Sequence, residues 1–180
     1  MVYEGVLEGR YVDLKACTED DAEFTLSLRT DPELGKIFPE VHSNVEQQRT
    51  WIRSQRSREG DYFFVVWNKS GERIGTIAVY NIVGDDGEGG RIIIRSDNPF
   101  DVFEAQLLLD RFAFFSLGLK LMKGFIFADN KRAIRFNKQV SGKLFPSELD
   151  ENGREIIRVE TTAEDFYAID RKISKLLYKE

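Results

Sequence analysis

Cysteine and histidine are almost absent from this chain. Its 180 residues include one Cys and one His. Cys17 therefore has no partner for an internal disulfide, and the two residue types cannot supply the ligand clusters that zinc sites use. Long apolar runs are missing too: the first ten residues do not form a secretory signal, and no run of about 18 apolar residues occurs. We therefore expect a cytoplasmic protein that binds no metal and no membrane.

Positive charge is also limited. Lys and Arg total 26 against 31 Asp and Glu, which gives a formal net charge of -5. A mildly acidic surface disfavours a broad electrostatic interaction with nucleic acid, so we expect no nucleic-acid partner. We interpret the local run of Arg49, Arg53, Arg56 and Arg58 as the solvated face of a helix. The 14 Phe argue against disorder, and the length suits one domain over residues 1–180.

Hydrophobic spacing and capping signals predict the elements of the first half. Alternating apolar residues mark strands, and two capping signals each precede a helix. The expected elements are a strand at 9–17, a helix from Thr18 to about Arg29, a helix opened by 43–46, strands at 61–67 and 73–83 around a turn at 68–71, a glycine- and acid-rich loop at 84–90, and a strand at 91–95.

The second half predicts a buried helix over 101–117, with a capping box of Asp101 and Glu104 at its start and Gly118 after its end. A strand at 121–128, a helix capped by Asn130, a hairpin at 143–161 and a last helix after Thr162 follow. The central strand, helix and strand require a right-handed parallel crossover, whereas the hairpins require antiparallel pairing. We therefore predict an α/β (α+β) fold with a mixed sheet of about seven strands and helices on both faces.

The segment Phe112–Gly118, the strand after it and the segment Asn130–Phe136 together resemble the signature of the GNAT superfamily of N-acetyltransferases. In that signature a helix ends in "aF..lG", a strand follows, and "N..ai.fy...G" closes the motif, with Gly142 in the place of the last glycine. The likeness spans 9–162. It implies the GNAT fold and an acetyl-CoA-dependent transfer of an acetyl group to an amine.

Two further likenesses point to one branch of the superfamily. Leu28–Pro32 resembles the opening of the branch that contains ribosomal-protein N-terminal acetyltransferases and nucleotide-sugar N-acetyltransferases. The run Gln48–Ile52, with Tyr62–Phe64 and Tyr80–Asn81, is more similar to the sugar-modifying members.

The resemblance also implies where acetyl-CoA binds. In the family the two central strands splay, which leaves backbone groups of 92–95 free for pantetheine, and an N–H near Ile94 stabilises the oxyanion. Phe125, Phe127 and Phe136 would wall the thioester pocket, or serve only as core. The implied cofactor-binding residues are Ile93, Ile94 and Arg95, then Val102, Phe103 and Glu104, then Asn130, Ala133, Phe136 and Asn137.

Candidate residues for proton transfer and acceptor binding lie elsewhere. Glu88 stands just before the central strand, near the acidic base of many family members, and His42 is the only side chain with an unperturbed pKa suited to the task. Arg29, Glu40 and Tyr80 are the candidates for the acceptor site. For each of them, surface or packing duty is the alternative.

Two departures from the family pattern concern function. The family's glycine-containing pyrophosphate loop is replaced by Ser96–Glu104, which has no glycine, and carboxylates at Asp101 and Glu104 would repel a pyrophosphate. The alternative interpretation of this segment is that it only begins a well-capped core helix. Asn137 stands where many members carry a Tyr general acid, and Asn donates a hydrogen bond but no proton. A thiol pKa near ~8.5 makes the thiolate a fair leaving group nonetheless.

Four functions remain open on the sequence. The first is N-acetylation of a small-molecule amine, with an amino-sugar nucleotide as one candidate. The second is N-acetylation of a protein N-terminus. The third is a GNAT-like binding module without turnover, which the two departures suggest, and the fourth is an unrelated α/β domain. The protein is expected to be a monomer or a homodimer.

Overall fold

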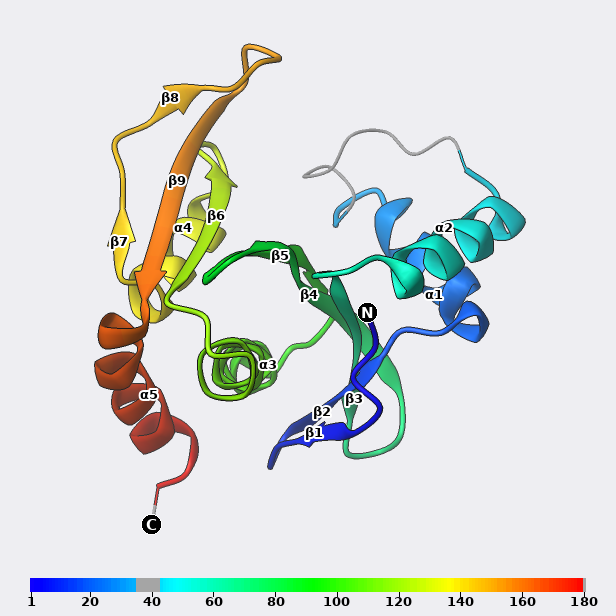
Figure 1. The fold of residues 1–180 in the computed structure, drawn as a ribbon, viewed down its shortest axis with the longest axis horizontal. Helices are drawn as coiled ribbons and strands as arrows, with labels where there is room; N and C mark the ends of the chain where they lie inside the picture. The colour runs from blue at the N-terminus through cyan, green and yellow to red at the C-terminus, as the bar shows by residue number, and fades with distance from the viewer. Residues whose placement is uncertain (35–42, 180) are drawn as a thin grey trace.

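The computed structural model describes residues 1–34 and 43–179, which form one nine-stranded mixed sheet with helices on both faces (Figure 1). The strands are β1 (Val6–Glu8), β2 (Val12–Ala16), β3 (Tyr62–Asn68), β4 (Arg73–Val83), β5 (Asp86–Ile94), β6 (Leu121–Phe127), β7 (Lys143–Leu144), β8 (Glu148–Leu149) and β9 (Glu155–Thr162). The helices are α1 (Ala22–Arg29), α2 (Val45–Ser57), α3 (Pro99–Arg111), α4 (Lys131–Val140) and α5 (Ala163–Leu177), with a π-helical turn at Phe112–Ser116.

The strand order is β1-β2-β3-β4-β5-β6-β9-β7, and β8 also pairs with β9. Only the β5–β6 pair is parallel among the described strands, and α3 connects these two strands. The expected mixed sheet with a central parallel crossover is therefore confirmed. The sheet exceeds seven strands because β1, β7 and β8 have three residues or fewer, which is too short for a periodic pattern.

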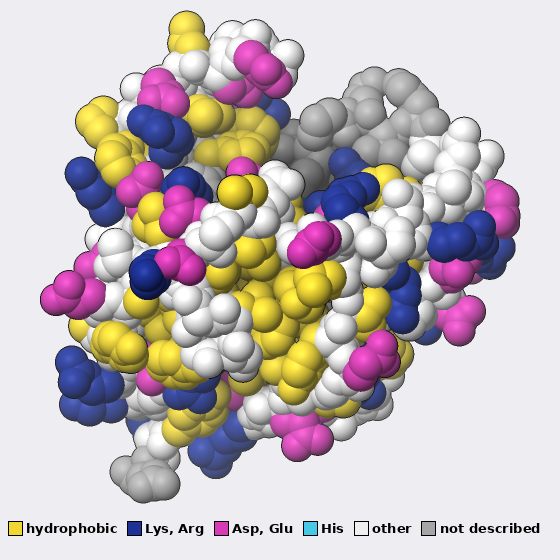
Figure 2. Space-filling model, viewed as in Figure 1, with side chains coloured by type: hydrophobic (Ala, Val, Ile, Leu, Met, Phe, Trp, Pro, Cys, Tyr) yellow, Lys and Arg dark blue, Asp and Glu magenta, His cyan; other side chains and the backbone are white. Residues whose placement is uncertain are grey.

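Each face of the sheet has its own hydrophobic core. The larger core joins α3 and α5 to one face through Phe64, Ile77, Leu109, Phe112 and Phe166. The smaller core lies under α1 and α2 and contains residues such as Ile52, Phe63 and Ala78. Figure 2 shows hydrophobic side chains gathered at the centre of the molecule around α3. α3 is thus the buried helix that its apolar sequence predicts.

The predicted loop at 84–90 was wrong, because β5 begins at Asp86 and only Gly84 and Asp85 connect it to β4. The glycines serve close packing inside the strand. A Cβ on Gly87 would lie 2.8 Å from Leu119 Cδ1, and a Cβ on Gly90 would lie 2.5 Å from the Tyr80 hydroxyl. Glycine here makes room for neighbouring side chains.

The predicted capping box of Asp101 and Glu104 was also wrong. α3 begins two residues earlier, at Pro99, and Asn98 is its N-cap, accepting from Phe100 N at 3.1 Å. Proline at the first helical position and Asn before it are a stronger start signal than an internal D-x-x-E.

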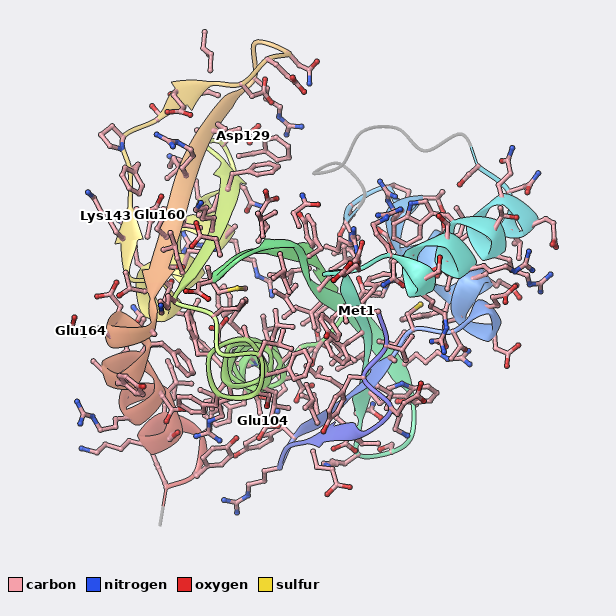
Figure 3. The ribbon with its side chains drawn as sticks, viewed as in Figure 1. Met1, Glu104, Asp129, Lys143, Glu160 and Glu164 are labelled. Carbon is pink, nitrogen blue, oxygen red and sulfur yellow. The ribbon has the colours of Figure 1, made fainter. Side chains whose placement is uncertain are left out.

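Glu104 is fully buried and turns away from the helix terminus, toward the β1–β2 connection (Figure 3). Its carboxylate accepts backbone N–H groups of Arg10, Tyr11 and Val12 at 2.7, 2.6 and 2.8 Å, and the Tyr178 hydroxyl at 2.7 Å. The side chain of Glu104 therefore joins the start of β2 to the C-terminal segment and is not available to a cofactor.

Candidate active site

A V-shaped opening separates β5 from β6. Their parallel pairing covers Asp86 to Glu88 on β5 and Leu121 to Lys123 on β6, and ends there. The strands are still close at the next position, where a Cβ on Gly124 would lie 3.2 Å from Gly89 O. Beyond it β6 continues to pair with β9, whereas no described strand pairs with this edge of β5. α3 and α4 each begin within a few residues of the open ends of these strands (Figure 1).

The backbone of Ile94 faces this opening. Arg95 donates its N–H to Ile74 O of β4 at 2.7 Å. This bond continues the β4–β5 register, in which Ile94 pairs with Gly75 and Ile93 pairs with Thr76. Successive residues of an antiparallel strand direct their peptide groups to opposite edges. The N–H of Ile94 therefore points away from β4, whereas that of Arg95 is already used and that of Ile93 faces β4.

One face of the opening carries Glu88 and Tyr80. Tyr80 on β4 pairs with Glu88 on β5, and Glu88 pairs with Lys123 on β6, so the three side chains share a face, the one covered by α1 and α2. Glu88 is half-buried on a strand and does not lie in the exposed loop that its sequence context predicted. Burial raises the pKa of the Tyr80 phenol, opposed by the nearby Arg91.

Arginines gather on the same face, where β5 ends beside α1. The Arg91 guanidinium lies 4.2 Å from the centroid of the Tyr80 ring. Arg29 is the last residue of α1. Burial is the main cause that lowers its pKa, and the positive charge of Arg91 lowers it further. Arg95 donates to Ser27 O and Asp31 Oδ2, both at 3.1 Å. The predicted acceptor residue Arg29 thus lies with Tyr80 and Arg91 on one face.

Glu40 and His42, two further candidates, lie outside the described residues. Their predicted roles in acceptor binding and proton transfer are therefore untested.

The opposite face of the opening is formed by α3 and α4. Phe103 and Phe136 connect the two helices, with ring centroids 5.1 Å apart. Asn130 caps α4 as predicted, accepting from Ala133 N at 3.1 Å. Asn137 donates to Ala133 O and accepts from Ser141 Oγ, both at 2.9 Å. Its polar atoms thus bond within α4 and its edge.

The N-terminus of α3 offers few backbone donors to a phosphate. Pro99 has no N–H, Phe100 donates to Asn98 Oδ1 at 3.1 Å, and Asp101 donates to Asn98 O at 3.1 Å. Val102 and Phe103 come later in the helix, where N–H groups bond to the preceding turn. The side chain of Asp101 adds a carboxylate, which accepts from Ser96 Oγ.

α4 presents the opposite charge. Lys131, Arg132 and Arg135 are exposed, and none of them has a carboxylate partner within the described residues. These cations follow β6 directly, at the open end of the V. The described residues contain no group of three or more His, Cys, Asp or Glu that could hold a metal ion. None of the described helices has the length and apolar character needed to cross a membrane.

The sequence did not reveal Asp61 and Arg91 as site residues. Asp61 is 1% exposed and forms a bidentate ion pair with Arg91, with Nη–Oδ distances of 2.7 and 3.0 Å. The two residues are far apart in the sequence, and no local pattern links them. The sequence signal for Arg91 was its position directly after two glycines, in the segment Gly89–Arg91.

The chain belongs to the GNAT acetyltransferase family. Residues 12–140, more than half of the chain, match the family model described as an acetyltransferase (GNAT) domain. The chain is therefore an N-acetyltransferase of the class that uses acetyl-CoA as cosubstrate, and the predicted resemblance is confirmed at this level. None of the curated proteins compared with the chain matches it.

Solved structures show the same fold. The nucleotide-linked sugar GNAT FdhC, in its apo form, is 22% identical, with a TM-score of 0.80 over 99% of this chain and 97% of that one. A GCN5-related N-acetyltransferase from Brucella melitensis is 17% identical, with a TM-score of 0.80 over 98% and 87%. A variant of the spermidine N-acetyltransferase SpeG from Vibrio cholerae is 14% identical, with a TM-score of 0.77 over 88% and 98%.

Proposed function

We propose that this enzyme transfers the acetyl group of acetyl-CoA to a primary amine of a small molecule, and that an amino-sugar nucleotide is its acceptor. The observation that carries the proposal is the N–H of Ile94, which points away from β4 at the open edge of β5, with Glu88 and Tyr80 on the adjoining face. The likeness to a nucleotide-linked sugar GNAT supports the sugar nucleotide as acceptor. Arg29, at the end of α1 beside this face, adds a cationic side chain suited to its phosphates.

The residues of this chain fit acetyl-CoA in one part and differ from the family pattern in another. The open edge of β5 suits the pantetheine arm, whose amides pair with exposed backbone groups. The α3 terminus does not suit the phosphates, because its first N–H groups are bonded to Asn98 and Asp101 adds negative charge. The exposed cations Lys131, Arg132 and Arg135 on α4 are the groups that would hold the phosphates.

Acetyl-CoA, when bound, supplies an acetyl group activated as a thioester. The amide of Ile94 donates to the negative charge that develops on the thioester oxygen. Glu88 takes one proton from the ammonium form of the acceptor and passes it to solvent, so that the neutral nitrogen can attack the acetyl carbon. The second proton, which the nitrogen loses once it is bonded to the acetyl carbon, also goes to Glu88. The carbon–sulfur bond breaks and the thiolate departs as the anion. Asn137 does not protonate it, because a side-chain amide donates hydrogen bonds but no proton.

The test is a thiol-release assay with acetyl-CoA and a panel of amines. The panel contains amino-sugar nucleotides, the same sugars without nucleotide, polyamines and peptides with free N-termini. We expect the fastest release with an amino-sugar nucleotide. Release with peptides alone would replace the proposal by protein N-terminal acetylation, and no release with any amine would refute it.

Glu88→Gln tests the proton acceptor. We expect kcat/KM to fall about 100-fold at pH 7, the usual contribution of a general base. The loss becomes smaller at high pH, where more of the amine is already neutral. The matched control is Glu160→Gln, because Glu160 on β9 also pairs with Lys123, from its other side (Figure 3). An equal loss in both variants would mean that only the net charge near Lys123 matters.

A further inference from the structure

Arg91 has a backbone conformation that arginine rarely adopts. Two residues of β5, Arg91 and Ile92, lie opposite Ile77 of β4, because the register moves from Thr76 with Ile93 to Ala78 with Gly90. Arg91 is the first residue of this bulge, with φ 52°. Bulges with a left-handed first residue normally have glycine there, because a residue with a Cβ is strained in this conformation. An arginine at this position requires compensating interactions.

Those interactions come from both its side chain and its backbone. The guanidinium pairs with both carboxylate oxygens of Asp61, the strong bidentate geometry. It also packs over the rings of Tyr80 and Trp51, at 4.2 and 5.1 Å from their centroids. The carbonyl oxygen of Arg91 accepts from Thr76 Oγ1 at 2.8 Å. Both the side chain and the backbone carbonyl of Arg91 thus hold the bulge in its conformation.

Asp61 is itself held in place by a residue of α2 and by the residue that follows this helix. Gln55 Nε2 donates to Asp61 Oδ1 at 3.1 Å, and Arg58 Nη1 lies 3.0 Å from Oδ2. Its side chain is 2% exposed. The ion pair therefore anchors the bulge of β5 to α2, one of the two helices that cover the face with Glu88 and Tyr80.

The position of the bulge connects this anchor to the chemistry. It lies between Glu88, the last residue paired with β6, and Ile94, whose N–H faces the opening. The bulge conformation therefore decides the direction in which the Ile94 amide points. It also places Tyr80 and Glu88 relative to that amide, since Tyr80 packs under the guanidinium.

We propose that Arg91, held by Asp61, is a positioning residue for acetyl transfer: it fixes the β5 bulge that aims the Ile94 N–H at the thioester. This inference rests on the proposed function. Arg91 acts through the backbone of β5 and does not touch the reacting atoms. A residue that aims a donor changes the rate of the chemical step more than it changes cosubstrate affinity.

The kinetic test compares Arg91→Ala, Arg91→Lys and Asp61→Asn with the parent enzyme, each assayed below its melting temperature. We expect kcat to fall about 10- to 100-fold, with KM for acetyl-CoA within about threefold. Lysine keeps the charge but loses the bidentate geometry, so it rescues only in part. Asn81→Gly is the matched control, because Asn81 is the other described non-glycine residue with positive φ, at 49°. It should leave kcat unchanged.

Amide hydrogen exchange separates this inference from the proposed function, because it needs no turnover. We expect faster exchange over 91–94 in Arg91→Ala and Asp61→Asn, and none of this change in Asn81→Gly. A kcat within twofold of the parent, or unchanged exchange over 91–94, would overturn the inference. An increase in acceptor KM alone would also overturn it, since Arg91 would then be an acceptor contact. If the parent enzyme acetylates no amine, the proposed function fails, while the exchange rates still test the anchor.

Discussion

Replacing Glu104 by Gln should destabilise the fold without weakening acetyl-CoA binding. Glu104 Oε1 accepts from Arg10 N and the Tyr178 hydroxyl, and Oε2 accepts from Tyr11 N and Val12 N. A glutamine amide can replace only one of these oxygens as an acceptor. In its better orientation the NH₂ group faces Arg10 N–H, which loses its partner, while the Tyr178 hydroxyl turns to accept.

The expected loss follows from this count. One part-buried donor is left unsatisfied, and the remaining bonds lose the benefit of a charged acceptor. Together these cost roughly 2 to 4 kcal/mol. For a chain of 180 residues that corresponds to a Tm about 4 to 16 °C lower. Tyr178→Phe removes one bond only and should cost about 1 kcal/mol.

Thermal and urea unfolding followed by circular dichroism measure both changes, and isothermal titration with acetyl-CoA measures binding to the folded variant. Glu104→Gln should retain the parent dissociation constant within twofold. A stability within about 0.5 kcal/mol of the parent would refute the assigned hydrogen bonds. A large loss of affinity in a stable, folded variant would restore Glu104 as a cofactor residue.

Two further predictions concern α3 and α4. Burial raises the pKa of Asp110 to about 8, and its carboxylate accepts a hydrogen bond from Gln106. The folded protein therefore holds a proton that the unfolded chain releases above about pH 4. The free energy of unfolding thus falls as the pH rises from 4 to 8. Asp110→Asn should remove this pH dependence and raise the free energy of unfolding by about 2 to 4 kcal/mol at pH 8. Urea titrations at pH 5 and pH 8 measure this change, and an equal gain in stability at both pH values would contradict the prediction. The double variant Arg132→Ala, Arg135→Ala should raise KM for acetyl-CoA about tenfold while leaving KM for acetyl-pantetheine, which lacks the nucleotide phosphates, unchanged; equal effects on both thioesters would exclude phosphate binding by α4.

Local signals predicted most of the secondary structure. The capping boxes of Thr18 with Asp21 and of Thr162 with Asp165 are both present. The signal at 43–46 was one residue early, since Asn44 caps α2 with Gln47. These signals succeed because a cap depends on residues within one helical turn.

The errors arose where a local pattern had a tertiary cause. The glycines of 84–90 are typical of a loop, but Gly87 and Gly90 lie in β5 because Leu119 and Tyr80 occupy the space of their side chains. Asp101 and Glu104 have the spacing of a capping box, but the partners of Glu104 are residues 10–12, over ninety positions away. No local rule identifies such partners.

The candidate site was predictable only in part. The resemblance predicts Ile94 as a residue of the acetyl-CoA site, and the alternation of the β4–β5 ladder explains why its N–H points away from β4 while that of Arg95 donates to Ile74 O. The pairing of Arg91 with Asp61 depends on the fold itself, because the bulge brings a β5 side chain to the α2–β3 segment. The direction of Asn137 also required the structure.

The most direct test of the account is the backbone amide signal of Ile94 in a nuclear magnetic resonance titration with acetyl-CoA. Labelling with ¹⁵N-isoleucine suits this measurement, because Ile92, Ile93 and Ile94 are consecutive on β5. We expect a large downfield shift of the Ile94 amide proton at saturation, as its N–H gains an acceptor, and a smaller shift of Ile93, whose N–H faces β4. Saturable binding that leaves Ile94 unshifted would contradict the proposed site.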